Sequence, residues 1–220
     1  MTRPARLVVI AGTATEVGKT WVAARLAGHL TGCGAMVAAR KPAQSFDAGA
    51  GPTDADVLAS ATGVEPGTVC PAHRWYELPM APFMAADALG RPPLLLHDLV
   101  AEIAWPEEAV DVGLLETAGG VRSPITTDGK DTVDLAAALC ADLVVLVAAA
   151  GLGAINGVRL CLTALTAVPV AVFLNRYDPV DDLHRRNLAW MQDHCPEAQF
   201  VTTIDQLAGV VIHDGRPCTG

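Results

Sequence analysis

The chain has 220 residues, of which 51% are hydrophobic and 18% are charged, and its formal net charge is −9. This length suits one domain with a buried core, and the composition excludes an intrinsically disordered chain. The acidic balance argues against nucleic acid or an anionic membrane as a partner. No apolar run approaches the roughly 18 residues of a membrane span, so we expect a cytoplasmic protein.

The cysteines and histidines show no spacing that is typical of a metal site. The sequence contains 6 cysteines and 6 histidines, but no C-x2-C pair and no H-x3-H pair. Neither a zinc site nor a small disulfide framework follows from such spacing. We therefore expect buried free thiols in a reducing compartment.

The first expected strand, RLVVIAG at 6–12, leads into a glycine-rich segment and then a helix over 18–34. Gly18-Lys19-Thr20 is how a phosphate-binding loop ends. The usual spacing G-x4-G-K-[ST] would place the first glycine at position 13, whereas Gly12 makes the spacing G-x5-G-K-T. A buried strand before the loop and a helix after it direct several backbone N–H groups at one anion. We expect Lys19 to reach the β- and γ-phosphates and Thr20 to bind Mg²⁺.

The second strand is expected at 35–40 and is followed by Lys41-Pro42, a glycine-rich loop and a short helix over 54–63. Lys41 is placed to stabilise charge on a transferring phosphoryl group, although a surface lysine is the alternative. Asp54 is a candidate Mg²⁺ ligand, with a plain helix cap as its alternative and Asp56 as a close competitor.

The third strand, VGLLE at 112–116, ends in Glu116, the second candidate carboxylate for Mg²⁺. The remaining elements are helices expected over 132–140, 156–167 and 181–194, and strands expected at 142–150, 169–175 and 199–203. This alternation predicts an α/β fold: one P-loop NTPase-like domain over 1–220, with a mainly parallel β-sheet covered by helices on both faces.

The segments that carry unusual residues all follow expected strands. They are residues 12–20, 41–45, 116–120, 151–156 and 175–178. Ligands of such sheets lie at the carboxyl ends of the strands, so we expect these segments to form one site.

Five motifs, GTATEVGKT, KPAQS, TDADVLA, LETAGG and GLGAIN, occur in the order and rough spacing of the dethiobiotin synthetase family, which the chain resembles over about 1–180. The G-x5-G-K-T spacing is that family's own variant. The resemblance implies an ATP- and Mg²⁺-dependent ligase that closes a cyclic urea from 7,8-diaminononanoate and CO2. The last forty residues match the family poorly.

The resemblance also implies roles for individual residues. Lys41, Lys19 and Thr15 would act in catalysis, with Thr15 and Ser45 bonded to the carbamate or diamine. Thr20, Asp54 and Glu116 would hold the metal. The nucleotide would contact Gly12, Glu16, Val17, Gly18, Lys19, Thr20, Trp21, Asp54, Glu116, Thr117, Ala118, Gly119, Asn175 and Arg176. Gly153 and Asn156 would bind the substrate carboxylate on the neighbouring subunit of a homodimer, although an ordinary N-cap is the alternative for Asn156.

The chain also departs from the family pattern. Ala14 replaces a common aspartate, Thr117 a glycine and Phe83 a common histidine, which leaves open a relative that accepts a different diamine. LNRYD at 174–178 resembles the N-K-x-D guanine motif, in which Asp178 would accept both guanine N–H groups, unless it caps the next helix. ATP is the first choice of nucleotide, with GTP possible.

Two other functions compete with this interpretation. A nucleotide switch of the GTPase or partitioning-ATPase type would act through protein partners, and NRYD favours it. However, its partitioning class carries a lysine near the start of the phosphate loop, and here none precedes Lys19. A cobyrinate-type synthetase shares the fold but carries a glutaminase domain, for which 220 residues leave no room.

Overall fold

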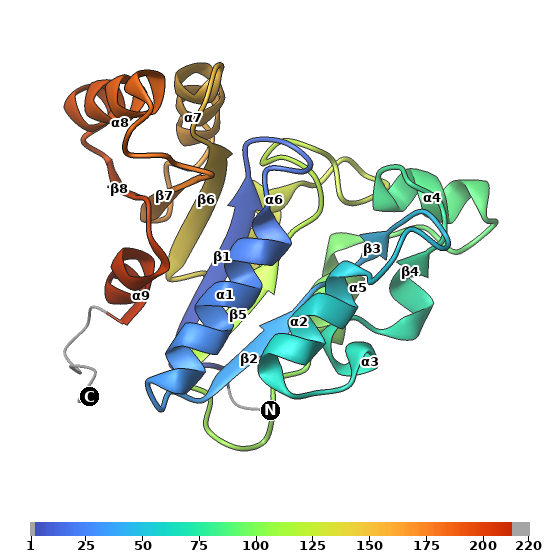
Figure 1. The fold of residues 1–220 in the computed structure, drawn as a ribbon. Helices are drawn as coiled ribbons and strands as arrows, with labels where there is room; N and C mark the ends of the chain where they lie inside the picture. Colours follow the sequence, from blue (N-terminus) through green and yellow to red (C-terminus); the bar gives the residue numbers. More distant parts are fainter. Residues whose placement is uncertain (1–2, 213–220) are drawn as a thin grey trace.

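The computed structural model describes residues 3–212 of the chain. Within this part, six strands form one sheet in the order β2-β5-β1-β6-β7-β8, and every neighbouring pair is parallel (Figure 1). The strands are β1 (Arg6–Gly12), β2 (Val37–Arg40), β5 (Val112–Glu116), β6 (Leu143–Ala149), β7 (Val170–Asn175) and β8 (Ala198–Val201). The predicted parallel α/β fold is confirmed.

The central strand β1 is buried on both sides, as its β-branched composition requires. Its residues alternate between two hydrophobic clusters, one on each face of the sheet: Leu7, Val9 and Ala11 belong to one, and Val8 and Ile10 to the other. Because side chains alternate with a period of two, a continuous apolar strand feeds both layers of the core.

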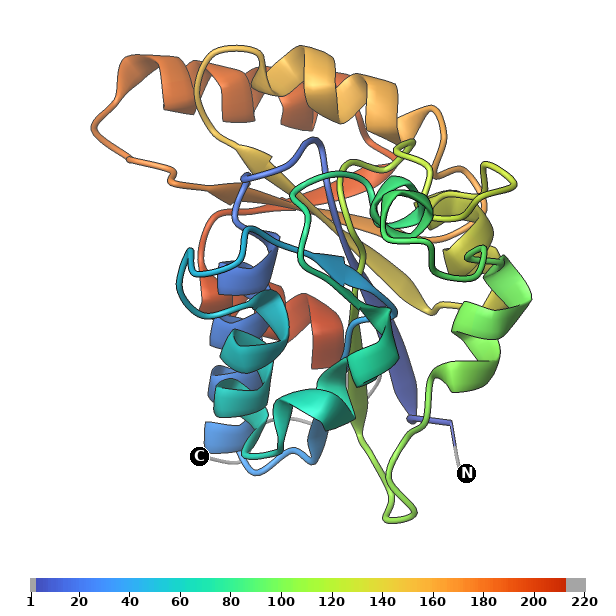
Figure 2. The same cartoon turned by 90° about the vertical axis from the view of Figure 1, so that its right-hand side faces the viewer.

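Helices cover both faces of the sheet (Figure 2). One face packs against α1 (Lys19–Gly32), α2 (Asp54–Thr62), α3 (Pro66–Val69) and α9 (Ile204–Ile212). The other packs against α5 (Leu96–Glu102), α6 (Thr132–Ala138), α7 (Ala154–Leu162) and α8 (Asp182–His194). Beside β2 lies a small parallel pair, β3 (Gln44–Ser45) and β4 (Trp75–Tyr76), with α4 (Pro82–Ala88) packed on it and the 3-10 turn Ala72–Arg74 before it.

In the second half of the chain, one expected helix is displaced and another helix was not predicted. The helix expected over 156–167 is Ala154–Leu162, because Gly153 adopts a φ of 87° before it and the Thr163 hydroxyl donates to the Leu160 carbonyl at its end. The helix α9 was missed altogether. Its sequence signal is a capping box: the Gln206 side chain accepts from the Thr202 and Thr203 N–H groups, and the Thr203 hydroxyl accepts from the Gln206 N–H.

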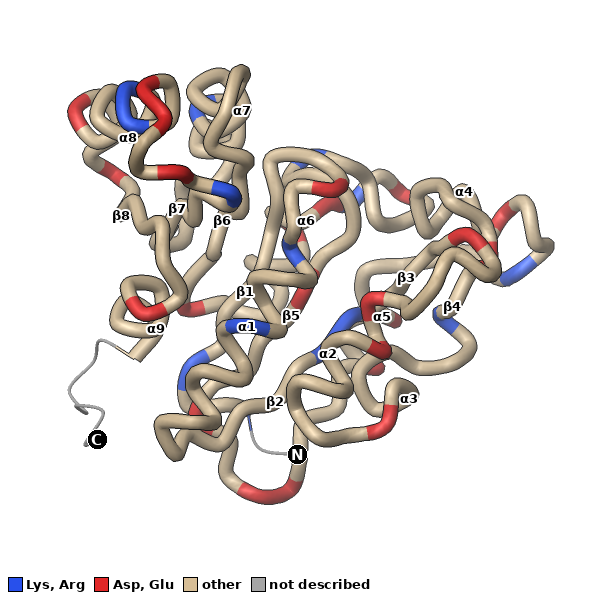
Figure 3. The backbone as a smooth tube through the Cα atoms, viewed as in Figure 1, with Lys and Arg blue, Asp and Glu red and all other residues tan. Residues whose placement is uncertain are grey.

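The surface carries charges of both signs; on α8, for example, acidic and basic residues are neighbours (Figure 3). No helix within residues 3–212 combines the length and the apolar character that crossing a bilayer requires. The expectation that the thiols are buried holds for Cys70, Cys161 and Cys195 but is wrong for Cys33 and Cys140, which are exposed, and Cys218 lies outside the described residues.

Candidate functional site

The five segments that the sequence singled out follow β1, β2, β5, β6 and β7. Since these strands are parallel neighbours, their carboxyl ends share one edge of the sheet. The segments 12–20, 41–45, 116–120, 151–156 and 175–178 therefore meet around the start of α1, as the sequence predicts.

The phosphate-binding loop is a tight turn between β1 and α1. A Cβ at Gly12 would lie 2.9 Å from both the Ala14 carbonyl oxygen and a Val17 methyl group, so no larger residue fits there. Glu16 adopts a φ of 59°, a conformation that residues other than glycine rarely take. Such local strain is typical of a loop whose shape serves a ligand.

Asn175, at the end of β7 and two strands away from β1, holds this loop. Its Nδ2 donates to the Val17 carbonyl at 2.9 Å, and its Oδ1 accepts from the Arg176 N–H at 2.9 Å. Gly18 has a φ of 96°, and a Cβ there would lie 2.1 Å from Asn175 Nδ2. Asn175 thus anchors the loop, a role that the sequence motif did not suggest.

Lys19 begins α1 with its side chain folded back over the loop. Its Nζ donates to the Ala14 carbonyl at 3.2 Å, and burial lowers the pKa of Lys19 below its ordinary value. The next residue, Thr20, points into a polar cluster formed with Lys41, Asp54 and Glu116. We call these four residues the cation cluster.

The cation cluster joins α1, α2 and the ends of β2 and β5. Lys41 Nζ lies 2.7 Å from Asp54 Oδ2 and 2.8 Å from Glu116 Oε1. The Thr20 hydroxyl lies 2.8 Å from Asp54 Oδ1 and 2.9 Å from Glu116 Oε1. Its one proton can satisfy only one of these two carboxylates at a time, whereas the Lys41 ammonium group donates to both.

The charges in this cluster are strongly coupled because Lys41 and Glu116 are each only 2% exposed. Burial alone would lower the pKa of Lys41, but Glu116 and Asp54 outweigh it and raise that pKa. Burial raises the pKa of Glu116, and Lys41 opposes that rise. Lys41 also outweighs the burial of Asp54 and lowers its pKa. The surface-lysine alternative for Lys41 is therefore excluded.

Asp54 owes its position to the start of α2. Thr53 is the N-cap and forms a capping box with Asp56, so Asp54 is not the cap, and the Asp56 carboxylate is engaged at the helix start and not with Lys41 and Glu116. The buried Gln44 side chain accepts from the Ala55 N–H at 3.0 Å and donates to the Thr53 hydroxyl at 3.3 Å. Gln44 was not among the predicted site residues, although it stands in KPAQS.

Other predicted site residues differ in their exposure and in their hydrogen bonds. Thr15 is exposed on the loop, and the Ser45 hydroxyl donates to the Met80 carbonyl. Thr117 is buried, and its hydroxyl donates to the Ile10 carbonyl at 3.3 Å, so it does not project toward a ligand in this structure. Ala118 and Gly119 begin the loop after β5, and Gly119 has a φ of 69°.

The segment 151–156 forms the start of α7. Gly153 is the N-cap, so Asn156 is not an ordinary cap, and its side chain is exposed in the first turn. A Cβ on Gly157 would lie 3.4 Å from the Thr13 side chain, so α7 packs against the phosphate loop. Leu152 is 95% exposed beside it.

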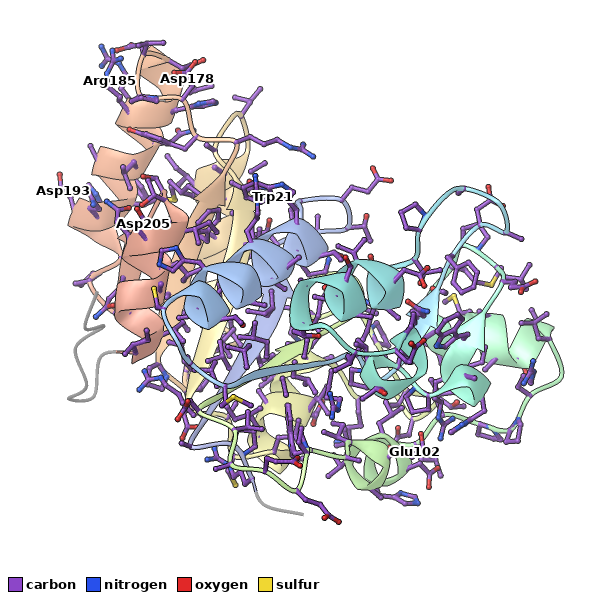
Figure 4. The ribbon with its side chains drawn as sticks, turned by 60° about the horizontal axis from the view of Figure 1, so that its bottom comes forward. Trp21, Glu102, Asp178, Arg185, Asp193 and Asp205 are labelled. Atoms are coloured by element: carbon purple, nitrogen blue, oxygen red, sulfur yellow. The ribbon has the colours of Figure 1, made fainter. Side chains whose placement is uncertain are left out.

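A cavity of about 470 Å³ lies at the start of α1 and the end of β7. The residues that line it are Gly18, Trp21, Phe173, Asn175, Arg176, Tyr177 and Thr202. Four of these were predicted nucleotide contacts, while Phe173, Tyr177 and Thr202 were not. Trp21 lies at the start of α1 beside this cavity (Figure 4). Asp178 is exposed; its carboxylate accepts from the Val180 N–H, and Asp181 rather than Asp178 caps α8.

Comparison with solved structures shows a related fold at low sequence identity. The signal recognition particle receptor FtsY of Elizabethkingia anophelis matches with a TM-score of 0.57 and 16% identity, over 94% of this chain and 62% of that one. A putative plasmid partition protein of Borrelia burgdorferi B31 bound to AMPPNP matches with a TM-score of 0.54 and 15% identity, over 94% and 90% of the two chains. These likenesses concern the fold alone.

Sequence comparison reaches further. A family model described as an AAA domain matches residues 6–192. The ATP-dependent dethiobiotin synthetase BioD of Rhodococcus jostii RHA1 is 41% identical over 75% of this chain and 70% of its own. That of Anaeromyxobacter sp. Fw109-5 is 40% identical over 80% and 79%. The resemblance read from five short motifs is thereby confirmed, and the chain belongs to the ATP-dependent dethiobiotin synthetase family, whose members are ligases that form C–N bonds.

Proposed function

We propose that this enzyme closes the ureido ring of dethiobiotin from 7,8-diaminononanoate and CO2, with ATP and Mg²⁺, in biotin biosynthesis. The relatives are ATP-dependent dethiobiotin synthetases, which supports ATP as the nucleotide and dethiobiotin as the product. The observation that carries the proposal is the cation cluster, in which Lys41 lies against two carboxylates beside the phosphate loop. A reaction between a carbamate and a γ-phosphate brings two anions together and needs such positive charge.

The proposed chemistry has three steps. One amine of the substrate takes up CO2 and loses a proton to become a carbamate. A carbamate oxygen then attacks the γ-phosphorus and displaces ADP, which leaves a carbamic–phosphoric anhydride. The second amine attacks the carbonyl carbon of this anhydride, expels phosphate and loses a proton, and the ring closes.

In this reaction Lys41 provides a charge that persists at neutral pH, because its neighbours raise its pKa. Its ammonium group is fixed by Asp54 and Glu116 and needs no reorganisation as charge develops. Lys19, now bonded to the Ala14 carbonyl, is placed to turn toward the phosphates. Thr15 and Ser45 are assigned to the carbamate or the diamine.

The cluster also fits Mg²⁺. Glu116 Oε2 is buried and has no hydrogen-bond partner among the described residues. Buried polar atoms are rarely left unpaired, so this oxygen is suited to bind a metal ion. No group of three or more His, Cys, Asp and Glu side chains in residues 3–212 would enclose a metal. Mg²⁺, however, takes only one or two carboxylates beside phosphate and water. Thr20, Asp54 and Glu116 would hold the ion, which would neutralise charge on the phosphate oxygens.

The remaining assignments complete the site. The cavity beside Trp21 and Asn175 is proposed to hold the nucleobase, since aromatic and amide groups line it. The carboxylate of the substrate is assigned to Gly153 and Asn156 of a neighbouring subunit, because Asn156 is exposed at a helix N-terminus beside the exposed Leu152. A homodimer and a cytoplasmic location stay predictions.

The test is phosphate release with ATP, Mg²⁺ and bicarbonate, measured with and without 7,8-diaminononanoate, with GTP replacing ATP in a parallel series. We expect release that depends on the diamine, together with a product of the mass of dethiobiotin. Thr20→Ala should lower this rate at least tenfold, whereas Thr163→Ala, which removes an exposed hydroxyl bonded only to Leu160, should not. Release that ignores the diamine would disprove this substrate.

A further inference from the structure

A second cavity, of about 400 Å³, lies away from the phosphate loop at the free edge of β2, the outer strand of the sheet. It is bounded by α3 on one face of the sheet, by α5 and residues 103–106 on the other, and by residues 40–42 between them. Glu102, on its wall, and Trp21, at the phosphate loop, lie far apart in Figure 4. The volume is within the range of small-molecule pockets.

One side of this cavity is formed by a buried cation. Arg40 is only 6% exposed, its Nε donates to the Ala104 carbonyl, and its Nη1 donates to the Ala39 carbonyl at 2.7 Å. Its guanidinium carbon lies 5.4 Å from the centre of the Trp105 ring. Within residues 3–212 no carboxylate forms an ion pair with it, which is unusual because buried charges are nearly always paired.

The guanidinium retains donors that the protein does not use. An arginine carries five N–H donors, and the two carbonyls engage only Nε and Nη1. Nη2 therefore has no partner among the described residues, and Arg40 itself lines the cavity. A carboxylate in the cavity would accept from Nη2 in a charge-assisted hydrogen bond and compensate the buried charge.

The remaining walls define the rest of the ligand. Leu99, Ile103 and Trp105 give the cavity an apolar lining that suits a hydrocarbon body. Glu102 also reaches the wall, where Arg74 holds it at 2.7 and 2.8 Å. The negative charge of Glu102 at this wall would repel a second negative charge on the ligand, which disfavours phosphates and dicarboxylates.

We propose that this cavity is a binding site for a small monocarboxylate with an apolar body. The ligand would lie next to the end of β2, where Lys41 follows Arg40. The backbone N–H of Lys41 donates to the carbonyl of Val69, which also lines the cavity, at 2.8 Å. The site is independent of the proposed reaction and stands or falls without it.

The first test is calorimetric titration of the full chain with hexanoate and, separately, with hexanamide, which has the same length and no charge. Both are run with a non-hydrolysable ATP analogue and Mg²⁺ present, so that the phosphate loop is occupied. We expect saturable binding of one hexanoate per chain and at least tenfold weaker binding of hexanamide, because a hydrogen bond to a charged group is lost. Equal affinities, no saturable binding of hexanoate, or binding that the nucleotide abolishes would overturn the proposal.

Variants locate the site. Arg40→Gln should weaken hexanoate binding at least tenfold, and Arg91→Gln, at an exposed arginine outside the cavity, should leave it unchanged. Should Arg40→Gln fail to fold, Gly67→Trp replaces it: Gly67 lines the cavity, and a Cβ there meets no atom within 4 Å, so a large side chain can be accommodated. Gly67→Trp should also lose binding. A folded variant of either kind that binds hexanoate like the parent chain would disprove the location.

Discussion

The Lys41 ammonium group holds together two carboxylates that would otherwise repel each other. Glu116 is as fully buried as Lys41, and Asp54 closes the other side. A buried pair of this kind contributes little net stability when it is complete, but removal of one partner is costly because the other charge is left uncompensated. The same coupling keeps Lys41 protonated, so its positive charge would stay in place during the proposed phosphoryl transfer.

We therefore expect Lys41→Met, which keeps the length of the side chain, to lower the free energy of unfolding by about 3 kcal/mol at pH 7. Urea denaturation followed by circular dichroism measures this difference. Lys130→Met is the matched control, since Lys130 is exposed and pairs only with Asp134 one turn away; it should change stability by about 0.5 kcal/mol or less. A Lys41→Met chain as stable as the parent would contradict the charge coupling described here.

At the scale of elements, the first turn of α2 is tied to β3 by Gln44. Because its amide bonds to groups on both sides of Asp54, it sets where that carboxylate lies relative to Thr20 and Glu116. Gln44→Leu should weaken the binding of ADP with Mg²⁺ by about tenfold, an effect of about 1.4 kcal/mol, while metal-free ADP binds as before. Titration calorimetry with and without Mg²⁺ separates the two affinities.

The control for this prediction is Gln192→Leu, at an exposed position on α8. If Gln44→Leu weakened both forms of the nucleotide equally, Gln44 would support the general fold of the site and not the position of Asp54. Gln44→Glu retains an acceptor for the Ala55 N–H and should recover part of the lost affinity.

The contact between β7 and the phosphate loop is the second case at this scale. Gly18→Ala should destabilise the chain by at least 1 kcal/mol, because its φ of 96° disfavours a Cβ and Asn175 occupies the space. In combination with Asn175→Ala the loss should be smaller than the sum of the two single losses by about 1 kcal/mol, since the clash disappears. A double-mutant cycle of thermal unfolding measures this, and strictly additive losses would argue against the contact.

At the scale of the whole molecule, the edge of the sheet beyond β2 is closed by long-range contacts. Arg74, after α3, holds Glu102 of α5 through two hydrogen bonds, and His73 Nε2 lies 3.2 Å from the same carboxylate. The bonds from Arg74 hold the pKa of Glu102 below its ordinary value of 4.5. This pair joins helices from opposite faces of the sheet.

A depressed pKa has a defined consequence for stability. The contribution of Glu102 is present above pH 4.5, its ordinary value, and is lost as the pH falls through the lower pKa of the folded state. Glu102→Gln should therefore be less stable than the parent chain by about 1.5 kcal/mol at pH 7, and this difference should shrink toward pH 3. Urea denaturation at a series of pH values tests this, and a difference that grows on acidification would be the wrong sign.

Prediction from the sequence succeeded where the signal was local. Strands such as RLVVIAG and DLVVLVAAA are apolar without interruption, so only burial on both faces accommodates them, and the parallel sheet follows. It failed at α9, whose start is marked only by the capping box of Thr203 and Gln206, in a segment that matches the family poorly. It also left 64–111 without elements, since helices of four to seven residues such as α3 and α5 owe their stability to packing and not to periodicity.

The sequence by itself determined the fold class, the phosphate loop and the identities of Lys41, Asp54 and Glu116 as candidates, because the alternation of strands and helices along the chain and the spacing of glycines are local properties. Only the tertiary structure decided that Lys41 is buried between both carboxylates, that Thr53 caps α2 with Asp56 as its capping-box partner, and that Asn175 supports the loop. It alone also revealed Arg40 as a buried cation that has no ion-pair partner within residues 3–212. Charge, burial and hydrogen-bond partners depend on residues as many as 160 positions apart, and no short window of sequence contains both partners.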